Sequence, residues 1–89
     1  MKIEVKKATA GELKKLGVAS WSQWGCDISE FDWEYDEDER CYIQKGKVVV
    51  TTAQGERAEI EQGDIVLFPK GLKCRWRVLE PIEKVYRFE

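Results

Sequence analysis

The sequence predicts a single all-β domain with one short N-terminal helix. Apolar and polar residues alternate along most of the chain, which is the period of half-buried strands. Glycine and proline turn signals recur between these short segments, a spacing typical of a β-sandwich or barrel. The 89 residues, 43% of them hydrophobic, are enough for one globular domain. We therefore treat residues 1–89 as one unit.

The N-terminal part is expected to hold a strand, a helix and a loop. Residues 2–6 alternate charged and apolar side chains, which predicts a short strand. Thr9 and Glu12 have the spacing of a capping box, so a helix is expected to begin there and to stop at Gly17. Residues 20–25 contain two tryptophans and are predicted to form a connecting loop that folds back on the body.

The middle of the chain shows the clearest alternation. Phe31, Trp33 and Tyr35 fall on one face of a predicted strand, with acidic residues on the other face. Residues 36–39 are all acidic and predict a solvated turn. Cys41 and the residues after it resume the inward-facing series.

The rest of the chain is expected to consist of strands and tight turns. Residues 44–47 predict a turn, because Gly46 allows a positive φ. The dipeptide Glu80-Pro81 is expected to separate the last two strands. The strands are predicted at residues 48–52, 57–61, 65–68, 72–79 and 82–88.

Composition excludes several classes of function. Fifteen basic and seventeen acidic residues give a net charge of −2, which argues against a nucleic-acid partner. No apolar run approaches the roughly 20 residues of a membrane helix, and the first residues lack the apolar stretch of a signal peptide. We therefore expect a cytoplasmic protein with no membrane partner. Three cysteines are too few for a disulfide scaffold, so free thiols are expected.

Two stretches carry motif spacing. In the first, Glu39 is followed after six residues by Gly46, which is similar to the end of the first cupin motif. Counting back from Glu39, Trp33 and Tyr35 fall where that motif has its paired histidines. This chain contains no histidine at all.

The second stretch resembles the second cupin motif without a gap. Gly63, Pro69 and Gly71 have the motif spacing, Cys74 takes the histidine position, and Val78 stands where an asparagine is usual. The whole pattern resembles the compact single-domain cupins grouped with the ureidoglycine aminohydrolase cupin domain. That resemblance spans a little over half of the chain.

The resemblance implies a compact jelly-roll β-barrel with a pocket at one mouth. Typical cupins hold manganese, iron or zinc there through three histidines and one glutamate, and only Glu39 of that set is kept. We therefore expect no cofactor. A divalent metal held by non-histidine ligands stays open, with Glu39, Cys41 and Cys74 as its candidate ligands.

Six residues are the candidates for lining the pocket. The aromatic members either line an open ligand site or simply plug the barrel. Glu39 is either a metal ligand or acid–base group, or an inert turn carboxylate. The cysteines are soft metal ligands, reactive thiols, a disulfide that forms on oxidation, or small buried side chains. The six are Trp33, Tyr35, Glu39, Cys41, Cys74 and Trp76.

Three functions of different classes fit the sequence. The first is a cupin that binds a small polar or anionic metabolite in an aromatic-lined pocket without the usual metal. The second is a metal-dependent or thiol-dependent enzyme of the aminohydrolase type, in which Glu39, Tyr35, Cys41 and Cys74 replace the missing histidines. The third is an association module, a homodimer in which the strand at residues 2–6 extends a partner's sheet.

Overall fold

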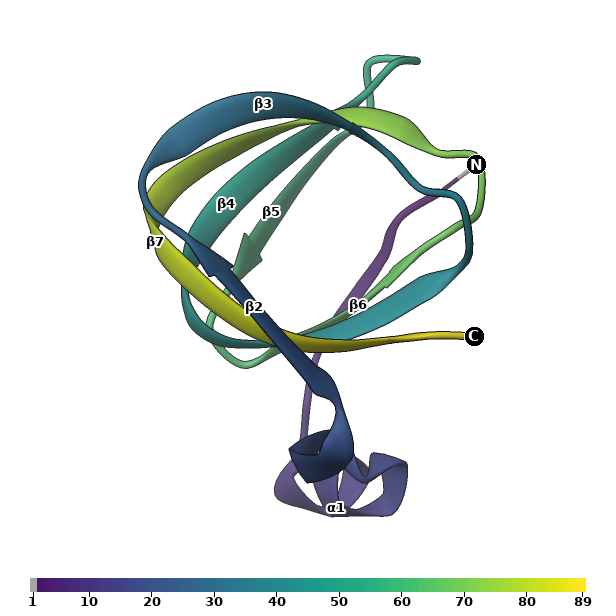
Figure 1. The fold of residues 1–89 in the computed structure, drawn as a ribbon, viewed down its shortest axis with the longest axis vertical. Coiled ribbons are helices and arrows are strands. Elements are labelled where there is room, and N and C mark those ends of the chain that lie inside the picture. The colour runs from purple at the N-terminus through teal and green to yellow at the C-terminus, as the bar shows by residue number, and fades with distance from the viewer. Residues whose placement is uncertain (1) are drawn as a thin grey trace.

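Seven β-strands and one α-helix form the chain in the computed structural model, which describes residues 2–89 (Figure 1). This confirms the prediction of an all-β barrel with a single short helix. The elements are β1 (Glu4–Lys7), α1 (Ala10–Leu16), a 3₁₀ turn (Val18–Ser20), β2 (Ser22–Cys26), β3 (Ser29–Glu34), β4 (Glu39–Thr52), β5 (Arg57–Glu61), β6 (Asp64–Phe68) and β7 (Lys73–Phe88).

Helix α1 lies outside the barrel (Figure 1) and is limited by its two caps. The Thr9 hydroxyl accepts a hydrogen bond from the Glu12 N–H at 3.2 Å, and the Glu12 carboxylate accepts one from the Thr9 N–H at 3.3 Å. Gly17 ends the helix with φ +69°, and its N–H reaches back to Leu13 and Lys14. The predicted capping box is therefore confirmed.

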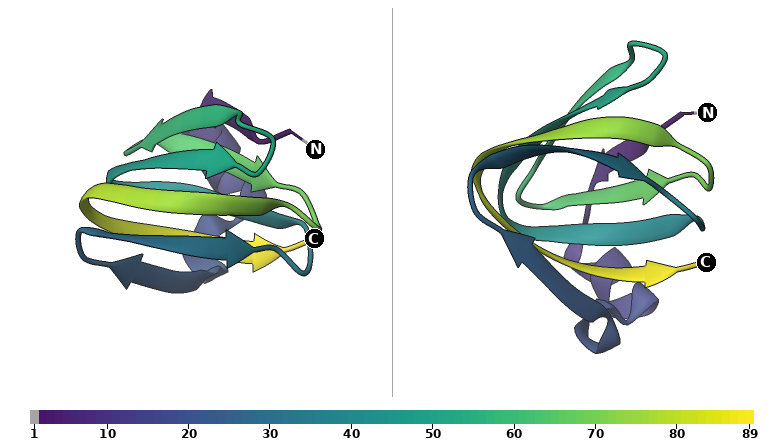
Figure 2. Two further views of the ribbon diagram at one scale, coloured as in Figure 1. Left: turned by 90° about the horizontal axis from the view of Figure 1, so that it is seen from above. Right: turned by 45° about the horizontal axis from the view of Figure 1, so that its top comes forward.

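The strands pair antiparallel in the order β1-β6-β4-β7-β2, with β5 added on β4 and β3 added on β7. Strands β4 and β7 are long and pair with each other along most of their length. Figure 2 shows both curving around the barrel, so that their two ends belong to different parts of its wall. Four of the other five strands pair directly with β4 or β7, and β1 is attached through β6. We call β4 and β7 together the β4–β7 frame.

Two predicted interruptions are absent from this frame. Residues 44–47 do not form a turn between strands, because β4 continues through them with register shifts against β7. Pro81 likewise does not divide β7. Gly46 has φ +95° and approaches the Pro81 carbonyl so closely that a Cβ at this position would collide with it. Glycine therefore bends the paired strands without breaking their pairing.

The predicted loop at residues 20–25 is also wrong in part. Ser22–Cys26 form strand β2, in which Trp24 lies opposite Lys84 and Cys26 lies opposite Ile82 of β7. Most of the β2 side chains are exposed, so the segment lacks the alternation that predicts a strand. Its pairing with β7 makes it a strand.

The core fills the barrel with inward-facing side chains, most of them from the β4–β7 frame, β5 and β6. Its largest fully buried members include Trp76, Phe68, Ile43 and Ile60. Strand β1 lies at one edge of the sheet, and its pairing with a second copy of the chain stays a prediction. Neither the length nor the hydropathy of any helix within residues 2–89 meets what a membrane crossing requires.

Candidate functional site

A pocket of about 140 Å³ is walled mainly by aromatic side chains from β2, β3, β7 and the segment that follows β3, and β4 contributes Glu39. Strand pairing brings these residues together from distant parts of the sequence. We call this site the aromatic pocket. It is lined by Trp24, Phe31, Trp33, Tyr35, Glu39, Trp76, Lys84, Tyr86 and Phe88.

A buried ion pair forms the charged part of the pocket wall. The Lys84 ammonium donates a hydrogen bond to Glu39 Oε2 at 2.6 Å, and each side chain is only 7% exposed. The expectation that Glu39 belongs to a solvated turn is therefore wrong. Glu39 is the first residue of β4, and the pairing of β4 with β6 and β7 places its side chain in the barrel interior. Each charge compensates the other, which is the condition for burying either of them.

Aromatic rings surround the Lys84 ammonium. Its Nζ lies 4.9 Å from the ring centroid of Trp76 and 5.1 Å from that of Trp24. Two further rings, Tyr86 and Phe68, lie at 5.6 and 5.8 Å. Ring faces attract cations, and the attraction is strongest where water is excluded. The cage and Glu39 together hold the ammonium as a fixed internal cation.

Two buried polar atoms in the pocket wall have no hydrogen-bond partner within residues 2–89. They are the Tyr35 hydroxyl and the Trp76 indole Nε1, on side chains that are 3% and 2% exposed. Burial, reinforced by the nearby charge of Glu39, raises the pKa of the Tyr35 phenol far above its ordinary value, so Tyr35 is a neutral donor. Both atoms are enclosed by the surrounding protein and do not face the open part of the pocket.

Exposed aromatic side chains form the rim of the pocket. Trp33 is 51% exposed and Phe88 is 54% exposed, although both line the pocket. The Trp33 and Tyr35 rings pack edge to face with their centroids 6.4 Å apart, and the Tyr35 ring stacks on that of Phe68 with centroids 4.7 Å apart. The aromatic surface thus continues from solvent to the buried wall.

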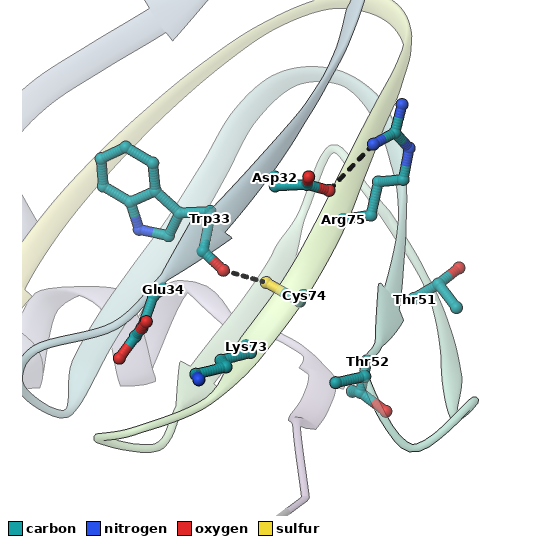
Figure 3. Close-up of a pocket in the computed structure, with 9 residues that line it drawn as sticks. Asp32, Trp33, Glu34, Thr51, Thr52, Lys73, Cys74 and Arg75 are labelled. Carbon is teal, nitrogen blue, oxygen red and sulfur yellow. Dashed lines mark hydrogen bonds and ion pairs between the residues drawn. The ribbon is translucent and has the colours of Figure 1, made fainter.

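The cysteines lie outside the aromatic pocket. Cys41 is fully buried in the core, opposite Val66 and Tyr86 in the strand pairing. Cys74 lines a separate open groove of about 760 Å³ on the barrel surface, where its thiol approaches the Trp33 carbonyl oxygen at 3.6 Å (Figure 3). All three cysteines are free thiols.

Burial makes the two inner thiols poor nucleophiles. It raises the pKa of the Cys41 thiol to about 12 and that of the Cys74 thiol to about 11. The Trp76 N–H lies close enough to Cys74 and Tyr35 to oppose the rise in both pKa values, but it makes no proper hydrogen bond with either. At neutral pH both thiols are protonated, whereas the thiolate is the nucleophile and the metal ligand.

The four positions that correspond to the cupin metal ligands do not fit a divalent metal. Trp33 has no atom that can coordinate a metal, while Tyr35 and Cys74 stay protonated. Glu39 is already bonded to a cation, the Lys84 ammonium. Among residues 2–89, no three histidine, cysteine, aspartate or glutamate side chains come together as a metal site. The Lys84 ammonium supplies the positive charge beside Glu39 instead.

Four of the six residues that the sequence predicted for the pocket line it, namely Trp33, Tyr35, Glu39 and Trp76. The sequence analysis did not identify Lys84 as a pocket residue. Lys84 alternates with Ile82 and Tyr86 along β7, so its side chain lies on the same face of the strand as theirs. This alternation is the sequence signal that Lys84 faces inward. A lysine at an inward position normally requires a buried carboxylate, and this rule would have pointed to Glu39.

Comparison with known proteins agrees with this architecture. A family model described as the EutQ-like cupin domain matches residues 13–86. A DUF861 family protein from Thermotoga maritima is 51% identical, with 99% of this chain and 100% of that chain covered and a TM-score of 0.97. The Clostridium difficile EutQ protein shares the fold at 20% identity and a TM-score of 0.67, over 94% of this chain and 64% of that one.

No curated protein matches this chain. The family model covers well over half of it, and the structure has the expected antiparallel barrel. The chain therefore belongs to the family of EutQ-like cupin domains.

Proposed function

We propose that this cupin domain binds a small organic molecule in the aromatic pocket. We also propose that the Lys84 ammonium supplies, beside Glu39, the positive charge that a metal ion supplies in typical cupins. The observation that carries the proposal is the concave aromatic pocket itself, in which an exposed rim of Trp33 and Phe88 leads to an inner wall that holds the Lys84–Glu39 ion pair.

The shape of the site supports the same function. Ligand pockets are mostly apolar and carry a few well-placed polar groups, and the aromatic pocket has this composition. Its exposed rim, Trp33 and Phe88, offers apolar surface to an entering molecule. A thiol-dependent enzyme is less well supported, because Cys41 and Cys74 are protonated at neutral pH and lie outside the pocket.

A ligand screen tests the proposal. The probes are a panel of carboxylates, amides, ureas, alcohols and heterocycles with up to about ten non-hydrogen atoms, a limit set by the small volume of the pocket. Any compound that binds only the folded protein raises its melting temperature. We expect at least one hit whose effect is lost in Trp76→Phe, which keeps an aromatic ring but changes the shape of the pocket wall.

The matched control is Trp21→Phe, which changes a second buried tryptophan that lies outside the pocket and contacts Arg87. The melting temperature of Trp21→Phe should rise with the hit compound as much as that of the wild type. The proposal is wrong if no compound stabilises the wild type, or if every hit acts equally on the two variants.

A further inference from the structure

We infer that the ligand of the aromatic pocket is a small, single-ring molecule that donates an N–H or O–H hydrogen bond to Oε1 of Glu39. This inference rests on the proposed function and names the ligand class of the same site. It follows from the hydrogen bonding of the Glu39 carboxylate, from the surface that this carboxylate keeps in the pocket and from the size of the pocket.

The protein satisfies only part of the Glu39 carboxylate. Its Oε2 accepts a hydrogen bond from the Lys84 ammonium at 2.6 Å, and within residues 2–89 no group donates to Oε1. An ionised carboxylate can accept about four hydrogen bonds, and a buried polar atom that lacks them costs stability. Oε1 is therefore an acceptor that a bound molecule can serve.

Oε1 also lies where a bound molecule can reach it. The Glu39 side chain is 7% exposed, and it lines the aromatic pocket. Among residues 2–89, the fully enclosed side-chain atoms without a partner include the Tyr35 hydroxyl and Trp76 Nε1, but not Glu39 Oε1. The unpartnered oxygen thus keeps surface that faces the pocket, unlike those two donors.

The carboxylate decides which ligands are disfavoured. A molecule that displaces water from Oε1 without restoring its hydrogen bond loses affinity, so a ligand without a donor binds weakly. An anion is disfavoured further, because it would meet the carboxylate as a like charge. The Lys84 ammonium does not reverse this preference, since it is bonded to Glu39 and lies within 4.9–5.8 Å of four ring centroids.

The size and the rings of the pocket determine the rest of the ligand. A cavity of about 150 Å³ engineered into another protein binds benzene, and the aromatic pocket has a volume of about 140 Å³. Phe31 stacks on Trp76 with centroids 5.9 Å apart, and the exposed rings of Trp33 and Phe88 form the rim. Aromatic surfaces of this kind favour a ring as the body of the ligand.

Two pairs of probes of similar size and shape test the inference. Phenol donates an O–H, whereas fluorobenzene has no donor. Benzamidine, a cation at pH 7, donates N–H groups, whereas benzoate has none. We expect each donor to bind the wild-type protein at least about threefold more tightly than its partner, which is the effect of one hydrogen bond. The donor that binds more tightly shows whether the natural ligand is neutral or cationic.

NMR titration measures these affinities and locates the bound probe. Trp24, Trp33 and Trp76 line the pocket, whereas Trp21 does not. A probe in the pocket should therefore shift the indole N–H signals of the first three tryptophans and leave that of Trp21 in place.

A double variant tests whether Glu39 is the acceptor. Glu39→Met combined with Lys84→Met removes the carboxylate and the ammonium together, so neither charge is left buried without its partner. The preference for phenol over fluorobenzene should disappear in this variant. Glu83→Gln, which changes an exposed glutamate outside the pocket, should keep it. The comparison of probes on the wild type decides the question even if the double variant does not fold.

The outcomes separate this inference from the proposed function. If fluorobenzene or benzoate binds as tightly as its donor partner and shifts the indole signals of the pocket, the donor requirement is refuted and the site itself stands. The same holds if the preference for phenol persists in the folded double variant, or if the only compounds that bind, among the probes and the ligand panel, lack an N–H or O–H. If no compound of either set binds, both proposals fail.

Discussion

Replacing Lys84 by methionine should destabilise the protein far more than the loss of an ordinary lysine. Methionine fills the space of the lysine side chain among the same aromatic rings, so the main loss is the charge beside Glu39. Removing one partner of a buried ion pair costs about 3–5 kcal/mol. The total stability of a domain of this size is about 5–15 kcal/mol, so the variant should lose a large part of it.

A double-mutant cycle in urea, followed by far-ultraviolet circular dichroism at pH 7, measures the effect. Glu39→Met combined with Lys84→Met replaces the ion pair by two apolar side chains, so it should cost less than Lys84→Met alone. Lys73→Met, an exposed position on the same strand, is the control and should change stability by less than about 0.5 kcal/mol. The reasoning is refuted if the double variant loses the sum of the two single losses. If Lys84→Met does not fold, recovery of the fold in the double variant decides the question.

Further predictions concern the thiols, the strand bend and the aminohydrolase reaction. At pH 8 a thiol reagent should label Cys26 first and reach Cys41 and Cys74 only after denaturation, and simultaneous labelling of all three would contradict the buried placement. The pKa values of about 12 and 11 for the two inner thiols exceed their ordinary value of 9.0, so the stability that these protonated thiols contribute is complete below about pH 9 and is lost as the pH rises toward 12. Cys41→Val should flatten this part of a pH–stability profile, and an unchanged profile would count against the prediction. Gly46→Ala should cost at least about 2 kcal/mol in urea unfolding because of its positive φ and the collision with Pro81, and a near-neutral effect would show that the bend relaxes freely. Assays of ammonia release from ureidoglycine with added manganese should find no activity above background, since three of the four metal-ligand positions carry other residue types; chelator-sensitive turnover would overturn this.

Local signals in the sequence predicted those elements whose structure is decided locally. The capping box at Thr9 and the alternation at Arg57–Glu61 each gave an element with the predicted bounds or nearly so. In contrast, β2 is a strand only because β7 lies beside it, and periodicity within the segment carries no trace of that partner. The same limit explains why Pro81 was expected to end a strand that in fact continues.

The candidate site divides in the same way. Motif spacing predicted that Trp33, Tyr35 and Glu39 share one pocket, and the short connection between β3 and β4 keeps these three residues close together. The contact between Glu39 and Lys84 joins residues far apart in the sequence, and no motif marks the lysine. Only the register between β4 and β7, which the structure provides, brings the carboxylate and the ammonium together.

The shared strands β4 and β7 also have a consequence for how the barrel forms. Four of the other five strands pair directly with β4 or β7, and β1 is attached through β6. Strand β4 pairs with β7 across a long stretch of intervening chain. Contacts of such large sequence separation require chain entropy to be lost before any pairing energy is gained, which slows folding. Once β4 and β7 are paired along most of their length, neither strand can leave the sheet without unfolding the other. In native-state hydrogen exchange, the amides of β4 and β7 should therefore open only with global unfolding, while the edge strands β1 and β2 exchange earlier through local opening.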